Sequence, residues 1–335
     1  MSPSTLPQRP LGRTGLRVAP LGFGCGDVGG IMVRGTPADR ERAAARAIEL
    51  GINYFDTASS YGQGQSERNL GPVLKALRAD VHVGTKVRLN PEDMKDVRGA
   101  IARSLDASLG RLGRERVDIL YLHNPVARQS AGSRVSTKVV LDDVAAGMED
   151  LKKAGKIRFF GMTALGEVGA LHRVLSSGAV EVAQVCFNLL NPTAAYPTPL
   201  GFPAQDFDGL LHLTEEVGVG TVGIRIMAAG ALSGTVERHP VAIPTVDPIA
   251  SGPDYATDVT RGRVFEALVR EGHASSVVEA AHRFAITPSG MSVILSGWSE
   301  MSHLEAAAAA IAKGPLSAAA LERAATCWAE LARRG

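Results

Sequence analysis

Short apolar runs alternate with longer amphipathic segments along almost the whole chain. Seven of these runs, apolar at successive positions, lie at residues 52–55, 81–85, 118–122, 157–161, 182–187, 219–224 and 291–295. Runs that are apolar on both faces are typical of a parallel sheet covered by helices. Seven or eight alternating β and α units without a linker therefore predict an α/β fold.

The segments between the runs carry helix signals. Segment 91–113 opens with a proline and acidic residues, and four of its apolar residues recur at steps of four, namely Val97, Ile101, Leu105 and Leu109. Thr36 and Pro37 give an earlier segment a capped helix start, and Gly51 follows its last apolar residue as a stop. The tail, 316–334, predicts an amphipathic helix that packs on the outside.

The chain shows no proline- or serine-rich seam, so we expect one domain over residues 1–335. Its longest irregular stretches are about 189–206 and 226–258. Stretches of that length in a compact domain are usually functional loops.

Composition and charge narrow the class of protein. The 335 residues are 45% hydrophobic and 21% charged, with a net charge of +2, which is typical of a soluble globular protein. Such a balance gives no reason to expect nucleic acid or a membrane as partner. Because the N-terminus lacks a signal-peptide core and no apolar run approaches membrane-span length, we expect a cytoplasmic protein.

Cysteine and histidine spacing argues against disulfides and metal. The three cysteines are far apart, with no CxxC pair, and we expect free thiols. The eight histidines show no HExxH or similar ligand spacing, so we expect no metal site.

A Rossmann-type dinucleotide fold is one alternative. The sequence GCGDVG at 24–29 has the GxGxxG form and precedes a helix and a strand that ends in Asp56. The context differs, because GIMVRG separates the third glycine from the cap at Thr36 and Pro20 interrupts the preceding run. We therefore expect that this glycine does not open a helix, and the motif is weak without its strand, turn and helix.

Candidate catalytic residues follow the apolar runs. In an α/β barrel such groups stand at the C-terminal ends of the strands. Three consecutive runs lead into Asp56, Lys86 and His123, and Tyr61 lies in the loop beyond the first. Taken singly, each has a structural explanation: a turn acid, a rim charge, a core histidine and a loop aromatic.

Together these four residues suggest acid and base chemistry. Asp56 and Lys86 would offset each other's burial, and the lysine would lower the pKa of a nearby phenol. A tyrosine tuned in this way can give a proton to a carbonyl oxygen or take one from a hydroxyl. That chemistry suits hydride transfer.

Several ordered motifs resemble the aldo-keto reductase family over nearly the whole chain. They are LGRTGLRVAPLGFG (11–24), GINYFDTASSYGQGQSE (51–67), GTKV (84–87), LYLHNP (120–125), GKIRFFGMTA (155–164), VAQVCFNLLNP (182–192) and GIRIMAAGALSG (223–234). The resemblance implies a (β/α)8 TIM barrel with an N-terminal β-hairpin and extra C-terminal helices. GGIMVRG and GIRIMAAGALSG look closer to the L-galactose or aldose dehydrogenase-like branch.

The resemblance also implies residue roles. Tyr61 would be the general acid and base, Lys86 its pKa modulator paired with Asp56, and His123 the donor that orients the substrate oxygen. The cofactor site would draw on Gly24, Cys25, Gly26, Thr163, Gln184, Arg225, Met227, Gly230, Leu232, Gly234, Gly297, Ser299, Glu300 and His303.

Three departures from the family pattern affect nicotinamide binding. The usual Ser-Asn pair falls on Thr163 and Ala164, so anchoring of the carboxamide rests more on Gln184. The loop 227–234 would lie along the pyrophosphate, helped by backbone N–H groups. The aromatic residue that often stacks under the nicotinamide near the seventh strand is missing, and Ile224 and Arg225 stand there.

The segment after the last apolar run predicts the cofactor. Between Ser296 and Lys313 it has no lysine or arginine for a 2′-phosphate, and it carries Glu300 and Glu305. A carboxylate can accept from the ribose 2′-hydroxyl and repels a 2′-phosphate. We therefore favour NAD(H), with NADP(H) as the alternative. His303 or Arg225 could still supply a cation, and Glu300 could serve only the start of a helix.

The expected substrate is small and polar. Loops 25–35, 126–138 and 189–206 should line the mouth, and only 5% of the chain is aromatic, which argues against a pocket walled by rings. A sugar or sugar-derived lactol fits, while the sequence does not fix the direction of reaction or the oligomeric state. A cofactor-binding regulatory subunit with little turnover is the other alternative.

Overall fold

The computed structural model describes residues 5–334 and shows a closed barrel of parallel strands. In chain order the barrel strands are β3 (Leu21–Gly24), β4 (Tyr54–Asp56), β5 (His82–Val87), β6 (Val117–Leu122), β9 (Ile157–Thr163), β10 (Val182–Cys186), β11 (Gly220–Ile224) and β12 (Val293–Gly297). Each strand pairs in parallel with the next, and β12 pairs with β3 to close the ring. The predicted barrel is confirmed, and the Rossmann alternative is wrong, because that fold has an open sheet.

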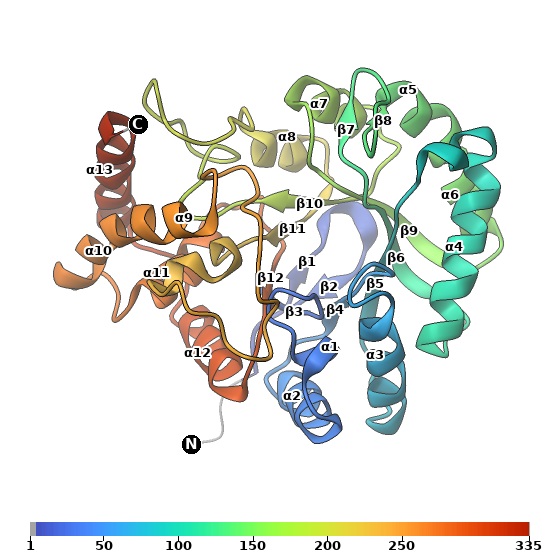
Figure 1. Ribbon diagram of the computed structural model, residues 1–335, viewed down its shortest axis with the longest axis horizontal. Helices are drawn as coiled ribbons and strands as arrows, with labels where there is room; N and C mark the ends of the chain where they lie inside the picture. Colours follow the sequence, from blue (N-terminus) through green and yellow to red (C-terminus); the bar gives the residue numbers. More distant parts are fainter. Residues whose placement is uncertain (1–4, 335) are drawn as a thin grey trace.

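Helices surround the barrel in the order of the chain (Figure 1). They are α1 (Ile31–Arg34), α2 (Pro37–Glu49), α3 (Gln65–Ala76), α4 (Val97–Leu112), α5 (Thr137–Val139), α6 (Ala145–Lys153), α7 (Val168–Ser176), α8 (Leu210–Glu216), α9 (Tyr255–Gly262), α10 (Glu266–Arg270), α11 (Val277–Ala285), α12 (Met301–Ala312) and α13 (Ala318–Arg334). Five short helices of other kinds are η1 (Gly12–Thr14), η2 (Pro91–Lys95), η3 (Val140–Val144), η4 (Ala228–Ser233) and η5 (Arg263–Phe265). Within residues 5–334, no helix combines the length and apolar character that a membrane crossing needs.

An N-terminal hairpin packs against the barrel, where the N–H of Arg13 donates to the carbonyl oxygen of Gly218 just before β11. Strands β1 (Arg9–Pro10) and β2 (Arg17–Val18) pair antiparallel, as expected. Leu11, Leu16 and Val18 form a small buried cluster with barrel-facing residues such as Tyr54 and Tyr121. A second small pair, β7 (Val126–Ala127) with β8 (Val135–Ser136), lies in the loop after β6.

The helix starts and apolar faces predicted from the sequence are caps and buried faces in the structure. The side chain of Thr36 accepts a hydrogen bond from the backbone N–H of Asp39, at 3.2 Å, and caps α2. The four apolar residues spaced along α4 are all buried. A short helix that the sequence did not predict, α1, begins at Ile31 with Gly30 as its N-cap. Gly30 adopts φ +83°, which lets the chain turn into this helix.

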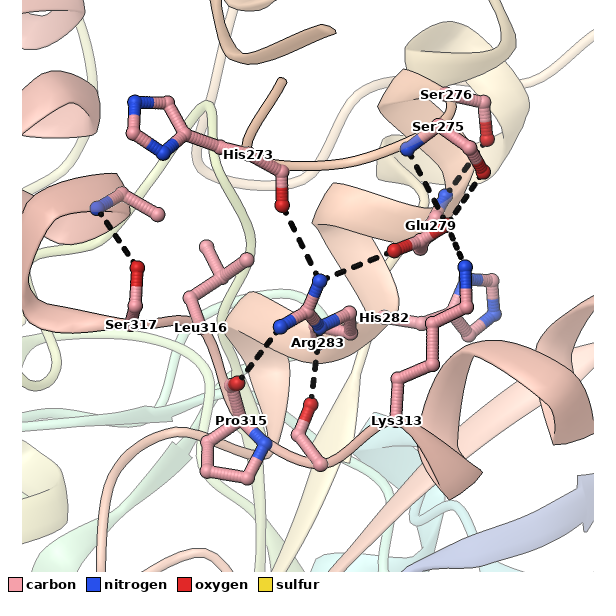
Figure 2. Close-up of polar contacts among 12 residues, drawn as sticks. His273, Ser275, Ser276, Glu279, His282, Arg283, Lys313, Pro315, Leu316 and Ser317 are labelled. Atoms are coloured by element: carbon pink, nitrogen blue, oxygen red, sulfur yellow. Dashed lines mark hydrogen bonds and ion pairs between the residues drawn. The ribbon is translucent and has the colours of Figure 1, made fainter. Parts of the chain in front are cut away.

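The C-terminal helices are tied together by a polar network around Glu279 and Arg283 of α11 (Figure 2). The Glu279 carboxylate accepts from Lys313 Nζ at 2.6 Å and from Arg283 Nη1 at 3.0 Å. Arg283 also donates to the carbonyl oxygens of His273, Gly314 and Pro315. The network thus joins α11 to the connection between α12 and α13.

Candidate active site

A buried ion pair stands at the C-terminal ends of β4 and β5. Asp56 is 2% exposed and Lys86 is 1% exposed. Lys86 Nζ forms an ion pair with Asp56 Oδ1 and donates to the carbonyl oxygen of Thr57 at 2.8 Å. Because an unpaired buried charge is costly, each of the two side chains makes the burial of the other feasible.

The second oxygen of Asp56 is held by neutral donors. Gln184 Nε2 donates to Asp56 Oδ2 at 2.6 Å, and the Tyr54 hydroxyl lies 3.3 Å from the same atom. The Tyr54 hydroxyl is also 2.7 Å from that of Tyr121. Neither tyrosine was predicted from the sequence; Tyr54 stands two residues before Asp56 and so shares its face of the strand.

Tyr61 and His123 lie beside this pair. Lys86 Nζ is 4.7 Å from the centroid of the Tyr61 ring. The rings of Tyr61 and His123 have centroids 6.2 Å apart and stand nearly perpendicular. The structure therefore brings together the four residues that were expected to meet at the mouth of the barrel.

The pKa of Tyr61 differs from the expectation. Burial raises the pKa of this phenol above its usual value, and it outweighs Lys86, which acts to lower it. Lys86 acts on the pKa of Tyr61 in the expected direction. The pKa is nevertheless raised overall, because the hydroxyl is withdrawn from water. Burial would also lower the pKa of Lys86, yet Asp56 and Tyr61 hold it above its usual value. Both groups are thus protonated at neutral pH.

His123 is a neutral imidazole in this site. Burial, together with the positive charges of Lys86 and Arg88, lowers its pKa to about 3. Its backbone N–H donates to the carbonyl oxygen of Val87 at 2.8 Å, which fixes the residue beside β5. A neutral imidazole can offer an N–H to an oxygen without giving up a full proton.

Further buried contacts hold the Tyr61 loop. Asp27 Oδ2 accepts from the backbone N–H of Gly62 at 2.9 Å. Glu67, fully buried in α3, accepts from Arg111 Nε and Thr85 Oγ1, both at 2.6 Å. None of these four side chains was predicted from the sequence as part of the site. Glu67 could have been found, because it ends the same glycine- and serine-rich stretch as Tyr61.

The expected cofactor residues from the first part of the barrel lie at its rim. Gly24 is in register with Asp56 on one side and with Gly297 on the other. Cys25 N–H donates to the carbonyl oxygen of Asp56 at 2.9 Å, and Gly26 lies next to the Tyr61 ring. The thiol of Cys25 is buried, and burial raises its pKa well above the usual value.

Thr163 and Gln184 form a contact of their own. Thr163 Oγ1 donates to Gln184 Oε1 at 3.3 Å, so the amide oxygen of Gln184 accepts from β9 while its nitrogen serves Asp56. Both ends of this amide are therefore used inside the protein. Arg225 follows β11 and donates from Nη1 to the carbonyl oxygen of Asp247 at 3.2 Å.

Glu300 lies between two histidines at the start of α12. It is the N-cap residue, but its side chain does not cap the helix. Its carboxylate accepts from Ser302 and lies 3.6 Å from His239 Nε2 and 3.7 Å from His303 Nε2. Ser299 Oγ donates to the carbonyl oxygen of Gly29 at 2.6 Å, which joins this segment to the loop after β3.

Comparison with known proteins identifies the family. The model of the Aldo/keto reductase family matches residues 20–329. The chain belongs to the aldo/keto reductase family. It is 29% identical to L-galactose dehydrogenase from Arabidopsis thaliana over 90% of this chain and 87% of that one. It is 28% identical to L-glyceraldehyde 3-phosphate reductase from Escherichia coli (strain K12), over 67% of this chain and 62% of that one.

A solved aldo-keto reductase from Bacillus halodurans, in its holo form, superposes on this chain with a TM-score of 0.71 at 23% identity, covering 96% of each chain. At that identity the superposition supports the shared fold. Aldo/keto reductases are NAD(P)-dependent oxidoreductases, and this chain is accordingly an oxidoreductase of the carbonyl and alcohol type.

The loop 227–234 of this aldo/keto reductase has an unusual backbone. Ala228, Ala229 and Gly230 all have positive φ, at 46°, 59° and 108°. The N–H groups of Ala228 and Gly230 donate to the carbonyl oxygens of Arg225 and Met227, at 2.7 Å and 2.8 Å, so both are used within the loop itself. Met227 and Gly234 bound the turn, and Leu232 within it is buried. That this loop lies along the pyrophosphate of a nicotinamide dinucleotide stays a prediction.

Proposed function

We propose that this aldo/keto reductase interconverts a small polar aldehyde or lactol and the corresponding alcohol or lactone, with Tyr61 as general acid and base. The observation that carries the proposal is the position of the Tyr61 ring close to both the Lys86 ammonium and the neutral imidazole of His123. When bound, the nicotinamide cofactor supplies or accepts the hydride.

Each of the four side chains has one task in this proposal. Tyr61 gives its phenolic proton to the carbonyl oxygen during reduction and takes it back during oxidation. Lys86 stays protonated and stabilises the phenolate that forms, while Asp56 fixes the position of the ammonium group. His123 donates an N–H to the substrate oxygen and orients it toward Tyr61.

A polar substrate is favoured by the composition of the chain and by its relatives. With only 5% aromatic residues the chain has few rings to wall a hydrophobic pocket. The relatives named above are an L-galactose dehydrogenase and an L-glyceraldehyde 3-phosphate reductase. We infer a sugar or sugar-like carbonyl compound as the substrate.

We further propose that NAD(H) binds more tightly than NADP(H). The Glu300 carboxylate stands at the start of α12, and its pKa is lowered by the Ser302 hydroxyl and by His303, so it is charged at neutral pH. Burial lowers the pKa of His303, which leaves that imidazole neutral there. A negative charge without a permanent cation beside it disfavours a 2′-phosphate.

Cofactor titration and a substrate panel test the proposal. Dissociation constants for NADH and NADPH should favour NADH, and Glu300→Ala should narrow the difference by strengthening NADPH. Turnover of a panel of aldehydes and sugars should favour polar compounds over aromatic ketones. Tighter NADPH binding that Glu300→Ala leaves unchanged would contradict the cofactor assignment. Absence of turnover with every compound would contradict the proposed activity.

A further inference from the structure

The turn that follows Tyr61 has a strained backbone. Gly62, Gln63 and Gly64 adopt φ values of +55°, +54° and +84°, and α3 begins directly after them. Gln63 carries a side chain, so its left-handed conformation costs free energy that its surroundings must offset. A turn of this kind keeps one shape only where neighbouring groups hold it, and that shape fixes the path of the chain at Tyr61.

The Asp27 carboxylate, in the loop after β3, holds this turn. Asp27 Oδ2 accepts a hydrogen bond from the backbone N–H of Gly62 at 2.9 Å. Asp27 Oδ1 accepts from Arg34 Nη1 at 3.0 Å, and Arg34 Nε donates to the carbonyl oxygen of Val241 at 2.7 Å. Both carboxylate oxygens therefore have a partner within the protein, and the arginine fixes the group that holds Gly62.

The segment around Asp27 also contacts the Tyr61 ring. A Cβ atom at Gly26 would lie 3.4 Å from the ring carbons Cε2 and Cζ, so the Gly26 backbone lies against the part of the ring that carries the hydroxyl. Val33 of α1 covers the turn itself, because a Cβ atom at Gly62 would meet Val33 Cγ1 at 2.5 Å. The ring and the turn after it are thus packed by the same segment that carries Asp27.

We propose that Asp27 is a positioning residue for the proton transfer by Tyr61. Its carboxylate holds the turn at Gly62, and this keeps the Tyr61 ring 4.7 Å from Lys86 Nζ and beside His123. Proton transfer needs the phenol within hydrogen-bond reach of the substrate oxygen, so a small displacement of the ring slows the reaction. The inference rests on the proposed function, because it assigns to Asp27 the placement of the acid that acts there.

Two substitutions of Asp27 separate the hydrogen bond from the charge. Asp27→Asn and Asp27→Ala both remove the negative charge, but the asparagine side-chain oxygen can still accept from the Gly62 N–H. Single-turnover hydride transfer from NADH to a carbonyl substrate that wild type accepts should be about 10- to 100-fold slower in Asp27→Ala and within about threefold of wild type in Asp27→Asn. Both variants should bind NADH equally well. Arg42→Gln, an exposed change on α2, is the control and should match wild type.

The same substitution in Tyr61→Phe shows whether Asp27 acts through Tyr61. In that protein Asp27→Ala should leave the residual rate of hydride transfer unchanged, because no phenol remains to be positioned. A further loss of similar size there would overturn the assignment. So would equal losses in Asp27→Ala and Asp27→Asn, a wild-type rate in Asp27→Ala, or a loss explained by weaker NADH binding.

Amide hydrogen exchange tests the contact without a substrate. If wild type turns over no carbonyl compound, the proposed function fails, and exchange in residues 60–65 then decides whether Asp27 holds the turn. The Gly62 amide should exchange at least about tenfold faster in Asp27→Ala than in wild type or Asp27→Asn, because it loses its acceptor. Equal exchange in the three proteins would show that Asp27 does not hold the turn.

Discussion

At the scale of single residues, the site depends on two opposite charges that are stable only together. Asp56 and Lys86 are both almost fully buried, and Asp56 also accepts hydrogen bonds from Tyr54 and Gln184. This arrangement keeps an ammonium group beside Tyr61 at a place that excludes water. The ion pair is therefore a means of positioning charge, since burying such a pair contributes little net stability by itself.

Removing one member of the pair should expose this dependence. We expect Lys86→Met to lower the free energy of unfolding by about 3–5 kcal/mol at neutral pH, because Asp56 is left buried without its cation. Burial raises the pKa of Asp56, and Lys86 opposes that rise, so the variant should take up a proton there on folding. A carboxyl group whose pKa is raised by folding stabilises the folded protein at low pH. The free energy of unfolding that Lys86→Met loses should therefore grow as the pH rises.

Urea unfolding at several pH values measures this effect. Lys138→Met, which removes an exposed lysine paired with Asp142, is the control and should match wild type. A Lys86→Met variant as stable as wild type at neutral pH would show that the pair is not needed for burial of Asp56.

The pH dependence of carbonyl reduction follows from Tyr61 and His123. In the proposed mechanism, reduction needs a protonated Tyr61, whose pKa burial raises above 10.0, and a neutral His123, whose pKa is about 3. The rate of reduction should therefore be constant across neutral pH and fall only as the pH rises through the pKa of Tyr61. Steady-state kinetics with a saturating cofactor measure this, and a fall that is complete by neutral pH would contradict it.

Part of this site could be predicted from the sequence. Asp56, Lys86 and His123 follow or end apolar runs, and parallel strands in a barrel bring their ends to one mouth. Tyr54 and Tyr121 could not be recognised, because an aromatic residue in a buried strand looks like ordinary core. The raised pKa of Tyr61 could not be predicted either, since it depends on how deeply the loop is packed.

At the scale of elements, local signals predicted α2, α4 and α13 but not the contacts of the long loops. Thr36 caps α2 because a hydroxyl followed by proline is a local arrangement that needs no partner. The segment 235–254 instead contacts the loop after β3, where Ile243 N–H donates to the carbonyl oxygen of Asp27 at 3.0 Å. Such a contact depends on the path of two distant segments, which no local pattern reveals.

The Glu279 network should control the attachment of the C-terminal helices. Hydrogen bonds from Lys313, Arg283 and Ser275 hold the pKa of Glu279 at about 2, against the desolvation that would raise it. A carboxyl group whose pKa is lowered by folding stabilises the folded protein at pH values above its unfolded pKa of 4.5. That stability is lost as the pH falls toward 2. We expect Glu279→Gln to lower the free energy of unfolding by about 1–3 kcal/mol at neutral pH and to approach wild type in acid.

Thermal or urea unfolding between neutral and acid pH measures the difference. Glu266→Gln, which removes an exposed carboxylate 3.8 Å from Arg270 on α10, serves as the control. A constant difference between Glu279→Gln and wild type at every pH would mean that the ionised carboxylate is not what stabilises this region.

At the scale of the whole molecule, the barrel topology could be predicted and the position of its loops could not. Apolar runs separated by amphipathic segments specify parallel strands with crossover helices, and these connections place successive strands side by side. The barrel topology does not determine three other properties. They are the single domain over residues 1–335, the cytoplasmic location and the oligomeric state. The first two remain predictions from composition.

The barrel brings together the four side chains of the proposed proton transfer. Strands β4, β5 and β6 supply Asp56, Lys86 and the approach to His123, and the loop after β4 supplies Tyr61. Single-turnover measurement of hydride transfer from NADH to a carbonyl substrate that wild type accepts, together with NADH binding, compares wild type with Tyr61→Phe and with Glu266→Gln, an exposed change on α10, as control. Tyr61→Phe should bind NADH normally but transfer hydride about 10²- to 10⁴-fold more slowly, with Glu266→Gln unchanged. An unchanged transfer rate in Tyr61→Phe would contradict the proposed role of Tyr61.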